Sequence, residues 1–418
     1  MCGIGAVWGD GAYERAGALA RWLMHRGEEG VGFAYLSGGR VELGRPRDGA
    51  DAVLVHTRYS TTGPYGVQIQ PVLAKHRDFE VAVAFNGTVV NYRRLAPGAS
   101  SDSEALAKRL AVLFWEYGPL DGLRALFDEL VGAASLIALT PDGVVAARDP
   151  RGIRPLAFST AAVASETVAL GLDAEELAPG QALFYSKGSL KLADVSRGPE
   201  RLCALEYVYF AHPASRLSGR GIWDVRRSLG RLLARGEGAE VDVVAYVPET
   251  ARAAAIGYAE ALGKPLVDAV VKNRYAGRIF IKPPGLRTAD EAFRVVRDLV
   301  EGRRVALVDD SIIRGTNLRS IVLELKRAGA REVHVRIASP PVRWPCFFGM
   351  DFQNRKELIA ANKNVEEIAA ALGADSLRYL DFDLFSSALG PNVCYGCFTG
   401  VYPMKIDVEW AERELSRA

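Results

Sequence analysis

The segment VALVDDSIIRGTN, residues 305–317, joins a continuous apolar strand to two aspartates and a glycine-containing loop. Helix-forming sequence follows the loop, so backbone N–H groups of the loop and of the first helical turn would converge on one point and could bind a phosphate. Asp309 and Asp310, at the carboxyl end of the strand, could hold sugar hydroxyls or a hydrated magnesium ion. An ordinary turn with an Asp-Ser helix cap is the alternative, but a cap needs only one carboxylate.

Other apolar strands lie around this segment, separated by helical sequence such as NLRSIVLELKRAGA. These strands are VDVVAYV, KPLVDAVV and EVHVRIASP. Strands that are apolar throughout and alternate with helices indicate a parallel sheet that is buried on both faces. We therefore predict an α/β domain over residues 201–418.

The first half of the chain has a different pattern. Short apolar strands, among them AVLVHTRYS, FEVAVAFNGT and GAASLIALT, alternate with glycine turns, and the helical segments SDSEALAKRLAVLFWEY and GLRALFDEL lie between them. This pattern predicts sheets with intervening helices. A chain of 418 residues is also too long for one ordinary core, so we expect a separate domain over residues 2–200.

Composition excludes several classes of protein. The formal net charge is +2, and no basic run suggests a nucleic-acid partner. The start, MCGIGAVWGDGAYER, lacks the basic region of a signal peptide, and no long apolar run predicts a membrane span. We expect a cytoplasmic protein. An odd number of cysteines, five, argues for catalysis or metal binding rather than a disulfide framework.

Cys2 follows the initiator methionine. Removal of Met1 would leave its thiol beside a free α-amine, whose reference pKa of about 7.7–8.0 lets it act as a base near neutral pH. The amine could then activate the thiol as a nucleophile. A cysteine that is merely buried in the first strand is the alternative.

Three further segments carry groups that could bind an amino acid. Arg58, at the end of an apolar strand, could hold a carboxylate, and Asp102, at a helix start, could hold an ammonium. Asn86 and Gly87 follow another strand and could donate N–H groups to an oxyanion. Taken singly, these residues could equally be a surface ion pair, a helix cap and a turn.

The order of the motifs resolves these alternatives. MCGIGAVWG, MHRGEEGVG, HTRYSTTG, QPVL, FNGT, SDSE and RDPRGIRPL resemble, in sequence, the class II glutamine amidotransferase domain of the N-terminal nucleophile hydrolases. This resemblance implies a four-layer αββα sandwich in which Cys2 is the nucleophile and its amine the base. It also implies that Asn86 and Gly87 form the oxyanion hole, and that Arg58 and Asp102 hold glutamine. Thr88 stands where the family more often has Asn.

The segment 305–317 likewise resembles the phosphoribosyl pyrophosphate loop of type I phosphoribosyltransferases. That implies carboxylates on the ribose diol and loop groups on the 5′-phosphate, with the binding residues Asp309, Asp310, Ser311, Arg314, Gly315, Thr316 and Asn317. Together with YVPETARAAAIGYAEALG and VVKNRYAGRIFIKP, the chain from Cys2 to about Tyr402 resembles the glutamine phosphoribosyl pyrophosphate amidotransferase family.

The family resemblance implies a reaction and its participants. Ammonia freed from glutamine displaces pyrophosphate from phosphoribosyl pyrophosphate, giving 5-phosphoribosylamine in the first step of purine synthesis. Thr250 would join Asp309 and Asp310 around Mg²⁺, and a flexible loop after Lys282 would close over the pyrophosphate. Inhibition by purine nucleotides and a homodimer or homotetramer are further family expectations.

Four cysteines remain once Cys2 is assigned. Cys394 and Cys397 form a Cys-x-x-Cys pair, and Cys203 and Cys346 are isolated in the sequence. Spacing alone leaves zinc and an iron–sulfur cluster open. The contexts RLCALEYVYF, PPVRWPCFFGMD and CYGCFTGVYP resemble the cluster-bearing branch of the family, which implies a structural [4Fe–4S] cluster.

Three departures from the family pattern leave room for other functions. AHPASR (211–216) lacks the usual Arg and Asp, the loop 285–300 is short and lacks Lys-Leu-Asn, and Asn317 replaces a Thr. A phosphoribosyl-pyrophosphate-binding paralogue, with glutaminase activity or a regulatory role only, is therefore one alternative. A glucosamine-synthesis-type amidotransferase is the other, but the loop 305–317 argues against it.

Overall fold

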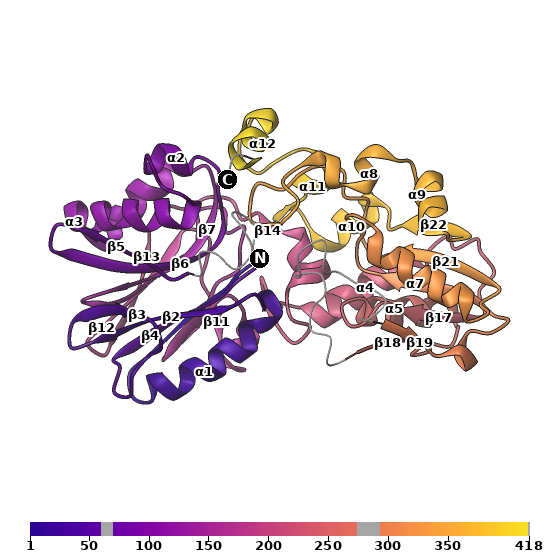
Figure 1. Ribbon diagram of the computed structural model, residues 1–418, viewed down its shortest axis with the longest axis horizontal. Helices are drawn as coiled ribbons and strands as arrows, with labels where there is room; N and C mark the ends of the chain where they lie inside the picture. The colour runs from indigo at the N-terminus through magenta and orange to yellow at the C-terminus, as the bar shows by residue number, and fades with distance from the viewer. Residues whose placement is uncertain (60–69, 274–292, 417–418) are drawn as a thin grey trace.

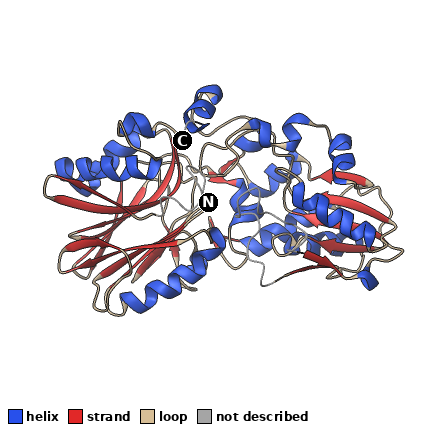
Figure 2. Cartoon of the chain, in the orientation of Figure 1, coloured by secondary structure: helices blue, strands red, loops and turns tan. Residues whose placement is uncertain are grey.

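The computed structural model describes residues 1–59, 70–273 and 293–416, in two halves that lie side by side (Figure 1). The first half contains two antiparallel sheets that pack face to face, with a helix layer on each outer side (Figure 2). This is the expected four-layer sandwich. The second half contains a parallel sheet with helices on both faces, as the apolar strands predicted.

The first sheet of the sandwich has the strand order β11-β9-β10-β1-β4-β2-β3 and the second has the order β13-β12-β8-β7-β6-β5. The strands are β1 (Gly3–Trp8), β2 (Val31–Ser37), β3 (Arg40–Leu43), β4 (Ala52–Thr57), β5 (Val72–His76), β6 (Phe79–Val89), β7 (Gly132–Thr140), β8 (Gly143–Ala147), β9 (Ala157–Ser159), β10 (Ala162–Ala164), β11 (Glu175–Glu176), β12 (Gln181–Ser186) and β13 (Ser189–Asp194).

The helices of this half cover the outer faces. Helix α1 (Ala12–Leu23) packs on the first sheet, and α3 (Asp102–Glu129) packs on the second, with α2 (Tyr92–Leu95) beside it. Backbone angles at Gly118 are not helical, so α3 consists of the two helices that the sequence predicted, joined at a kink before Pro119. The short helices η1 (Met24–Arg26) and η2 (Thr167–Ala169) lie in the connections.

The alternation of side chains along β6 positions the future site. Val81, Val83 and Phe85 face α3, whereas Ala82 and Ala84 face the other sheet. Because successive side chains of a strand point to opposite faces, residues 86 and 88 then also face the space between the sheets. The same alternation in β4 turns residue 56 toward that space, in line with Ala52 and Leu54.

The parallel sheet of the second half has the order β17-β20-β21-β22. Helices α4 and α5 pack on one face, and α7 and α9 pack on the other. The elements are α4 (Ile222–Leu233), β17 (Val243–Tyr246), α5 (Arg252–Leu262), β20 (Arg304–Asp309), α7 (Thr316–Arg327), β21 (Glu332–Ile337), α8 (Ile359–Asn362), α9 (Val365–Leu372), β22 (Ser376–Tyr379) and α10 (Phe382–Leu389), with short helices η6 (Arg297–Leu299) and η7 (Arg355–Glu357).

One expected strand, KPLVDAVV, differs from the prediction. It meets β17 only at the bridge between Val244 and Leu266, since Pro265 has no N–H for a continuous ladder. Its end forms β18 (Val270–Lys272), which pairs antiparallel with β19 (Phe293–Val295) outside the main sheet.

A set of small elements joins the two halves. Strand β14 pairs in parallel with β23, and the C-terminal helix α12 packs its Ala411 and Leu415 against Val90 and Phe347. In Figure 1, α12 lies above the junction of the halves. The joining elements are β14 (Leu202–Cys203), the π-helix η3 (Glu206–Phe210), β15 (Arg216–Leu217), β16 (Arg220–Gly221), β23 (Val393–Cys394), α11 (Gly396–Thr399) and α12 (Val408–Ser416).

Within the described part of the chain, none of the helices has the length and apolar character needed to cross a membrane.

Gly230 on α4 and Gly257 on α5 let these two helices pack in close contact, and this contact leads to a prediction about stability. A Cβ at Gly257 would lie 1.9 Å from the carbonyl oxygen of Arg227. We expect Gly257→Ala to force the helices apart and to cost about 1–3 kcal/mol, seen as a lower unfolding midpoint in a thermal scan. Gly238→Ala, at a glycine with no atom within 4 Å, is the control. An unchanged midpoint for Gly257→Ala would contradict the packing.

Candidate active sites

Cys2 lies directly before β1 and contacts Arg26 and Tyr59. Its thiol donates to the carbonyl oxygen of Tyr59 at 3.5 Å, and Arg26 Nε donates to the Cys2 carbonyl oxygen at 3.2 Å. Burial raises the pKa of the Cys2 thiol, while the charge of Arg58 lowers it and that of Asp102 raises it. The residues that the sequence assigned to glutamine binding therefore lie within electrostatic reach of the proposed nucleophile.

Asn86 and Gly87 lie inside β6 rather than after a strand or in a turn, so the sequence interpretation of FNGT was wrong on this point. The ladder to β7 extends through both residues because a glycine is present. A Cβ at Gly87, where φ is 151°, would lie 1.9 Å from the carbonyl oxygen of Ala133. The Asn86 side chain is 1% exposed, and within the described ranges neither its oxygen nor its nitrogen has a hydrogen-bond partner. A buried amide without partners is the feature expected of a donor that awaits a ligand.

Arg58 and Asp102 are both buried beside this region. Arg58 follows β4 directly, as predicted, and its Nε lies 3.4 Å from Glu29 Oε2. Ser101, not Asp102, caps α3, because the Ser101 side chain accepts from the Glu104 N–H. Asp102 instead accepts from the Val89 N–H at 3.3 Å. Its carboxylate is thus directed toward the strand that carries Asn86, and a helix-cap role is excluded.

A buried cluster of charged side chains, which the sequence did not reveal, holds the backbone of Cys2 through Arg26. Arg26 donates to Glu206 at 2.8 and 3.1 Å and also to Glu166, and all three side chains are fully buried. Glu206 also pairs with Arg154 at 3.4 Å. Arg26 and Arg154 lie in the motifs MHRGEEGVG and RDPRGIRPL, so motif membership was the available signal. Glu206 lies on η3, outside these motifs.

In the second half, the predicted acid pair lies at the carboxyl end of β20. Thr250 Oγ1 and Ser311 Oγ both donate to Asp310, the latter at 2.7 Å, and the Asp310 N–H donates to Asp309 at 2.8 Å. Burial and the neighbouring Asp310 raise the pKa of Asp309, and burial raises that of Asp310. The structure therefore brings Thr250 to the acid pair, as the family resemblance implied. Two crowded carboxylates favour a cation between them.

The phosphate loop ends at α7. Gly315, at φ 79°, forms the N-cap of this helix without a side-chain hydrogen bond, so no side chain caps its first turn. Thr316 and Asn317 open the helix, as expected. The Arg314 side chain pairs with Glu357 and lies 3.7 Å from Asp351. The loop can thus offer the N–H groups and the helix end that a phosphate requires.

Tyr59 lies between the two sites. Its carbonyl oxygen accepts from Cys2, and its hydroxyl donates to Asp351 Oδ2 at 2.8 Å. Asp351 in turn accepts from Arg314 through its carbonyl oxygen at 3.3 Å. A chain of contacts therefore runs from Cys2 to Arg314 in the loop before α7. The flexible loop predicted after Lys282 lies largely outside the described residues.

The four remaining cysteines converge at the junction of the halves. Cys203 and Cys394 are direct neighbours in the β14–β23 pair, Cys397 lies on α11, and the loop that carries Cys346 bonds to Cys397 through the Arg343 and Trp344 N–H groups. All four are buried free thiols. Burial raises the pKa of Cys203, Cys394 and Cys397, and the charges of the other cysteines raise it further. Within the described ranges, no group of three or more His, Cys, Asp or Glu side chains is arranged to hold a metal ion.

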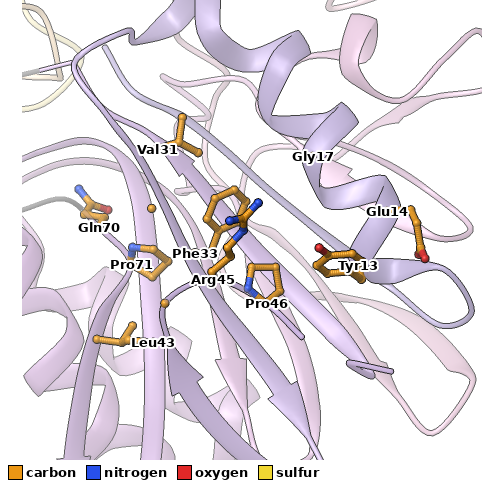
Figure 3. Close-up of a pocket in the computed structure, with 12 residues that line it drawn as sticks. Tyr13, Glu14, Gly17, Val31, Phe33, Leu43, Arg45, Pro46, Gln70 and Pro71 are labelled. Atoms are coloured by element: carbon orange, nitrogen blue, oxygen red, sulfur yellow. The ribbon is translucent and has the colours of Figure 1, made fainter. Parts of the chain in front are cut away.

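A cavity of about 790 Å³ lies elsewhere in the sandwich, between α1 and the edge of the first sheet (Figure 3). Tyr13, Phe33 and Pro46 contribute to its wall. None of the predicted site residues lines it, so we assign no part of the chemistry to this cavity.

Known proteins resemble the whole chain. A family model described as "Glutamine amidotransferase domain" matches residues 56–172. The amidophosphoribosyltransferase of Archaeoglobus fulgidus is 37% identical, covering 99% of this chain and 100% of that protein. The solved glutamine phosphoribosylpyrophosphate amidotransferase of B. subtilis, complexed with ADP and GMP, is 35% identical with a TM-score of 0.84, covering 97% of this chain and 98% of that one. A structure described as the allosteric regulatory enzyme of purine biosynthesis is 34% identical with a TM-score of 0.86, covering 99% of each chain.

His56, which sequence reasoning did not single out, generates a prediction on pH. It is buried, neither ring nitrogen has a hydrogen-bond partner in the described part of the chain, and burial lowers its pKa to about 3. The unfolded imidazole has a pKa near 6.5, so below about pH 6.5 only the unfolded chain takes up this proton. Because of this imidazole, the free energy of unfolding should fall by about 1.4 kcal/mol for each unit that the pH drops below about 6.5.

Denaturant unfolding at pH 7 and pH 5 tests this expectation. His56→Gln should lose less stability between the two pH values than the unaltered chain, whereas His76→Gln, on β5, should behave like the unaltered chain. Equal losses in all three proteins would contradict a buried neutral imidazole at position 56.

Proposed function

The chain belongs to the amidophosphoribosyltransferase family, and on this premise we propose how its residues carry out the first step of purine biosynthesis. In that reaction, ammonia from glutamine replaces the pyrophosphate of phosphoribosyl pyrophosphate, giving 5-phosphoribosylamine, glutamate and pyrophosphate. The observation that carries the assignment of two coupled sites is the position of Tyr59, which contacts Cys2 with its backbone and Asp351, beside the phosphate loop, with its side chain.

At the first site, the Cys2 sulfur attacks the side-chain amide carbon of glutamine. The buried thiol keeps its proton because its pKa is raised, so a base must accept that proton. Loss of Met1 would free the Cys2 amine, whose reference pKa of about 7.7–8.0 lets it act as this base near neutral pH. The Asn86 amide and the Gly87 N–H would hold the oxyanion. The C–N bond then breaks, ammonia leaves, and water hydrolyses the thioester to glutamate.

Arg58 and Asp102 would orient glutamine for this attack. Their burial supports the assignment, since a charge pair with the substrate is stronger where water is excluded. Arg58 would bind the α-carboxylate and Asp102 the α-ammonium. The charges of Arg58 and Asp102 act on the Cys2 thiol, which supports the binding of glutamine beside this residue.

At the second site, the nitrogen of ammonia attacks C1 of the ribose, and the bond from C1 to the pyrophosphate oxygen breaks. Asp309 and Asp310 would bind the ribose hydroxyls, and the loop residues Ser311, Arg314, Gly315, Thr316 and Asn317 would bind the 5′-phosphate. Thr250, Asp309 and Asp310 would hold Mg²⁺, which would neutralise charge on the departing pyrophosphate. The crowded carboxylates and the Thr250 hydroxyl fit such an ion.

A [4Fe–4S] cluster is our proposal for the four cysteines. The donor set fits a cluster, because four buried thiols converge at the junction of the halves and thiolates are the usual cluster ligands. A single zinc ion with four thiolate ligands is the alternative that the sequence spacing leaves open. The cluster would supply structural linkage rather than redox chemistry.

Inhibition by nucleotides, the oligomeric state and the cellular location are further parts of the proposal. The B. subtilis structure holds ADP and GMP, so we propose that purine nucleotides inhibit this protein too. We also propose a homodimer or homotetramer. Five free thiols fit a reducing compartment, and this supports a cytoplasmic location.

An anaerobic assay that follows glutamate and pyrophosphate together tests the coupled reaction. The unaltered enzyme should release equal amounts. Cys2→Ala should lose glutamine-dependent turnover by about 1000-fold or more but still release pyrophosphate when ammonia is supplied. Asp310→Asn should do the reverse, hydrolysing glutamine without releasing pyrophosphate. Glutamate release without pyrophosphate in the unaltered protein would favour the paralogue alternative instead.

Metal analysis of protein purified anaerobically tests the cluster. We expect about four iron and four acid-labile sulfide per chain, with both lost in Cys397→Ser. The matched control is Cys2→Ala, which should keep its iron because that thiol is not a ligand. One zinc per chain, without sulfide, would overturn the iron–sulfur assignment.

A further inference from the structure

Arg154 is a fully buried residue whose role none of the steps above has used. It lies in the loop between β8 and β9, with a side chain that is 0% exposed. Nε donates to the Phe348 carbonyl oxygen at 2.6 Å, and Nη1 pairs with Glu206 at 3.4 Å. Nη2 has no partner. A buried charged donor without a partner is costly, because it has lost its hydration and gained no hydrogen bond in return.

The unpartnered nitrogen lies beside the oxyanion donor Gly87. Gly349 fits between them: a Cβ at this position would lie 3.0 Å from the Gly87 Cα and 3.2 Å from Arg154 Nη2. Gly349 has a φ of 116°, which favours glycine on its own. The backbone of the loop that follows Cys346 is thus wedged between Arg154 and Gly87.

The main chain of Arg154 is tied to the other oxyanion donor. Its carbonyl oxygen accepts from Ser135 Oγ at 2.8 Å. Ser135 is the cross-strand neighbour of Asn86 in the β6–β7 pair. Side chains of directly opposed residues lie about 4.5–5.5 Å apart, so Ser135 lies next to the Asn86 amide. One residue therefore contacts the immediate neighbours of both donors.

The nucleophile shares the same anchor. Glu206 Oε1 accepts from Arg154 and from Arg26, and Arg26 in turn holds the Cys2 carbonyl oxygen at 3.2 Å. Arg26 and Arg154 therefore link Cys2 and the neighbours of the two proposed oxyanion donors to the same buried carboxylate, that of Glu206. Catalytic groups need positions fixed to about 0.5 Å, and a single shared anchor provides this.

We propose, on the basis of the role proposed for Cys2, that Arg154 is a positioning residue for glutamine hydrolysis: it fixes Asn86 and Gly87 relative to Cys2 and sets the Phe348–Gly349 backbone against the oxyanion hole. Its effect falls on the transition state, where the oxyanion exists, and not on bound glutamine, which Arg58 and Asp102 hold.

Kinetics of glutamine hydrolysis test this assignment. Arg154→Met should lower kcat by about 10- to 100-fold and leave KM within about 3-fold. Arg154→Lys keeps a charged donor for the Phe348 carbonyl and should recover part of kcat. Arg336→Met removes a comparably buried arginine, paired with Glu237 in the parallel sheet, and should keep kcat for glutamine. A lysine variant no better than the methionine variant would overturn the assignment.

An inhibitor pair separates positioning from folding. Glutamate γ-semialdehyde forms a tetrahedral adduct with a thiol and needs the oxyanion donors, whereas glutamate needs only the binding residues. Arg154→Met should weaken the aldehyde by the same factor as kcat and leave glutamate within about 3-fold. Equal weakening of both inhibitors, or loss of ammonia-dependent pyrophosphate release, would point to a general structural role and overturn the assignment.

Gly349→Ala provides an independent test, because the added methyl group would press on Gly87 and on Arg154. It should reproduce the loss of kcat, while Gly390→Ala, at a glycine with φ 92° and no atom within 4 Å, should not. If the unaltered protein fails to hydrolyse glutamine, or Cys2→Ala still does so, the proposed function is wrong. If both behave as expected but the Arg154 and Gly349 variants keep kcat, only the role of Arg154 is wrong.

Discussion

The buried carboxylate of Glu206 is the interaction on which the arrangement of the molecule depends. It accepts from Arg26, which belongs to the sandwich and holds Cys2, and from Arg154, which contacts the loop after Cys346. Burying such charges rarely adds net stability, because desolvation offsets most of the attraction. Removing one partner is nevertheless costly, since the remaining charge stays buried. The cluster therefore specifies one relative position of the two halves.

The two proposed sites are built differently. Cys2 directly precedes β1, and the proposed oxyanion donors Asn86 and Gly87 lie within β6, where side-chain alternation fixes their direction. The acid pair and phosphate loop lie at the carboxyl end of a parallel sheet, where the following helix adds its N–H groups. Tyr59 and Asp351 join the sites through one hydroxyl hydrogen bond of 2.8 Å, so contact between them depends on the position that the charge cluster sets.

Much of this could be predicted from sequence, because the informative residues are close in the chain. Asp309, Asp310 and the loop to Asn317 form one local unit, and the alternation in β6 and the two parts of α3 are local patterns too. Contacts between residues far apart in the chain could not be predicted. Arg26 and Glu206 are 180 residues apart, and no sequence pattern indicates that they form an ion pair. Local reading also misjudged FNGT as the end of a strand, since only the pairing with β7 shows that the strand continues.

The pairing of β14 with β23 has a consequence for how such a protein can arise. Cys203 and Cys394 stand side by side, although nearly all of the phosphoribosyl half lies between them in the chain. This half therefore begins and ends at one place, although it follows the sandwich in the chain and is not inserted into it. The sandwich strands, which are complete by Asp194, keep all their hydrogen-bonded neighbours whatever follows, so such a protein can arise by adding the second half at the carboxyl end of the sandwich.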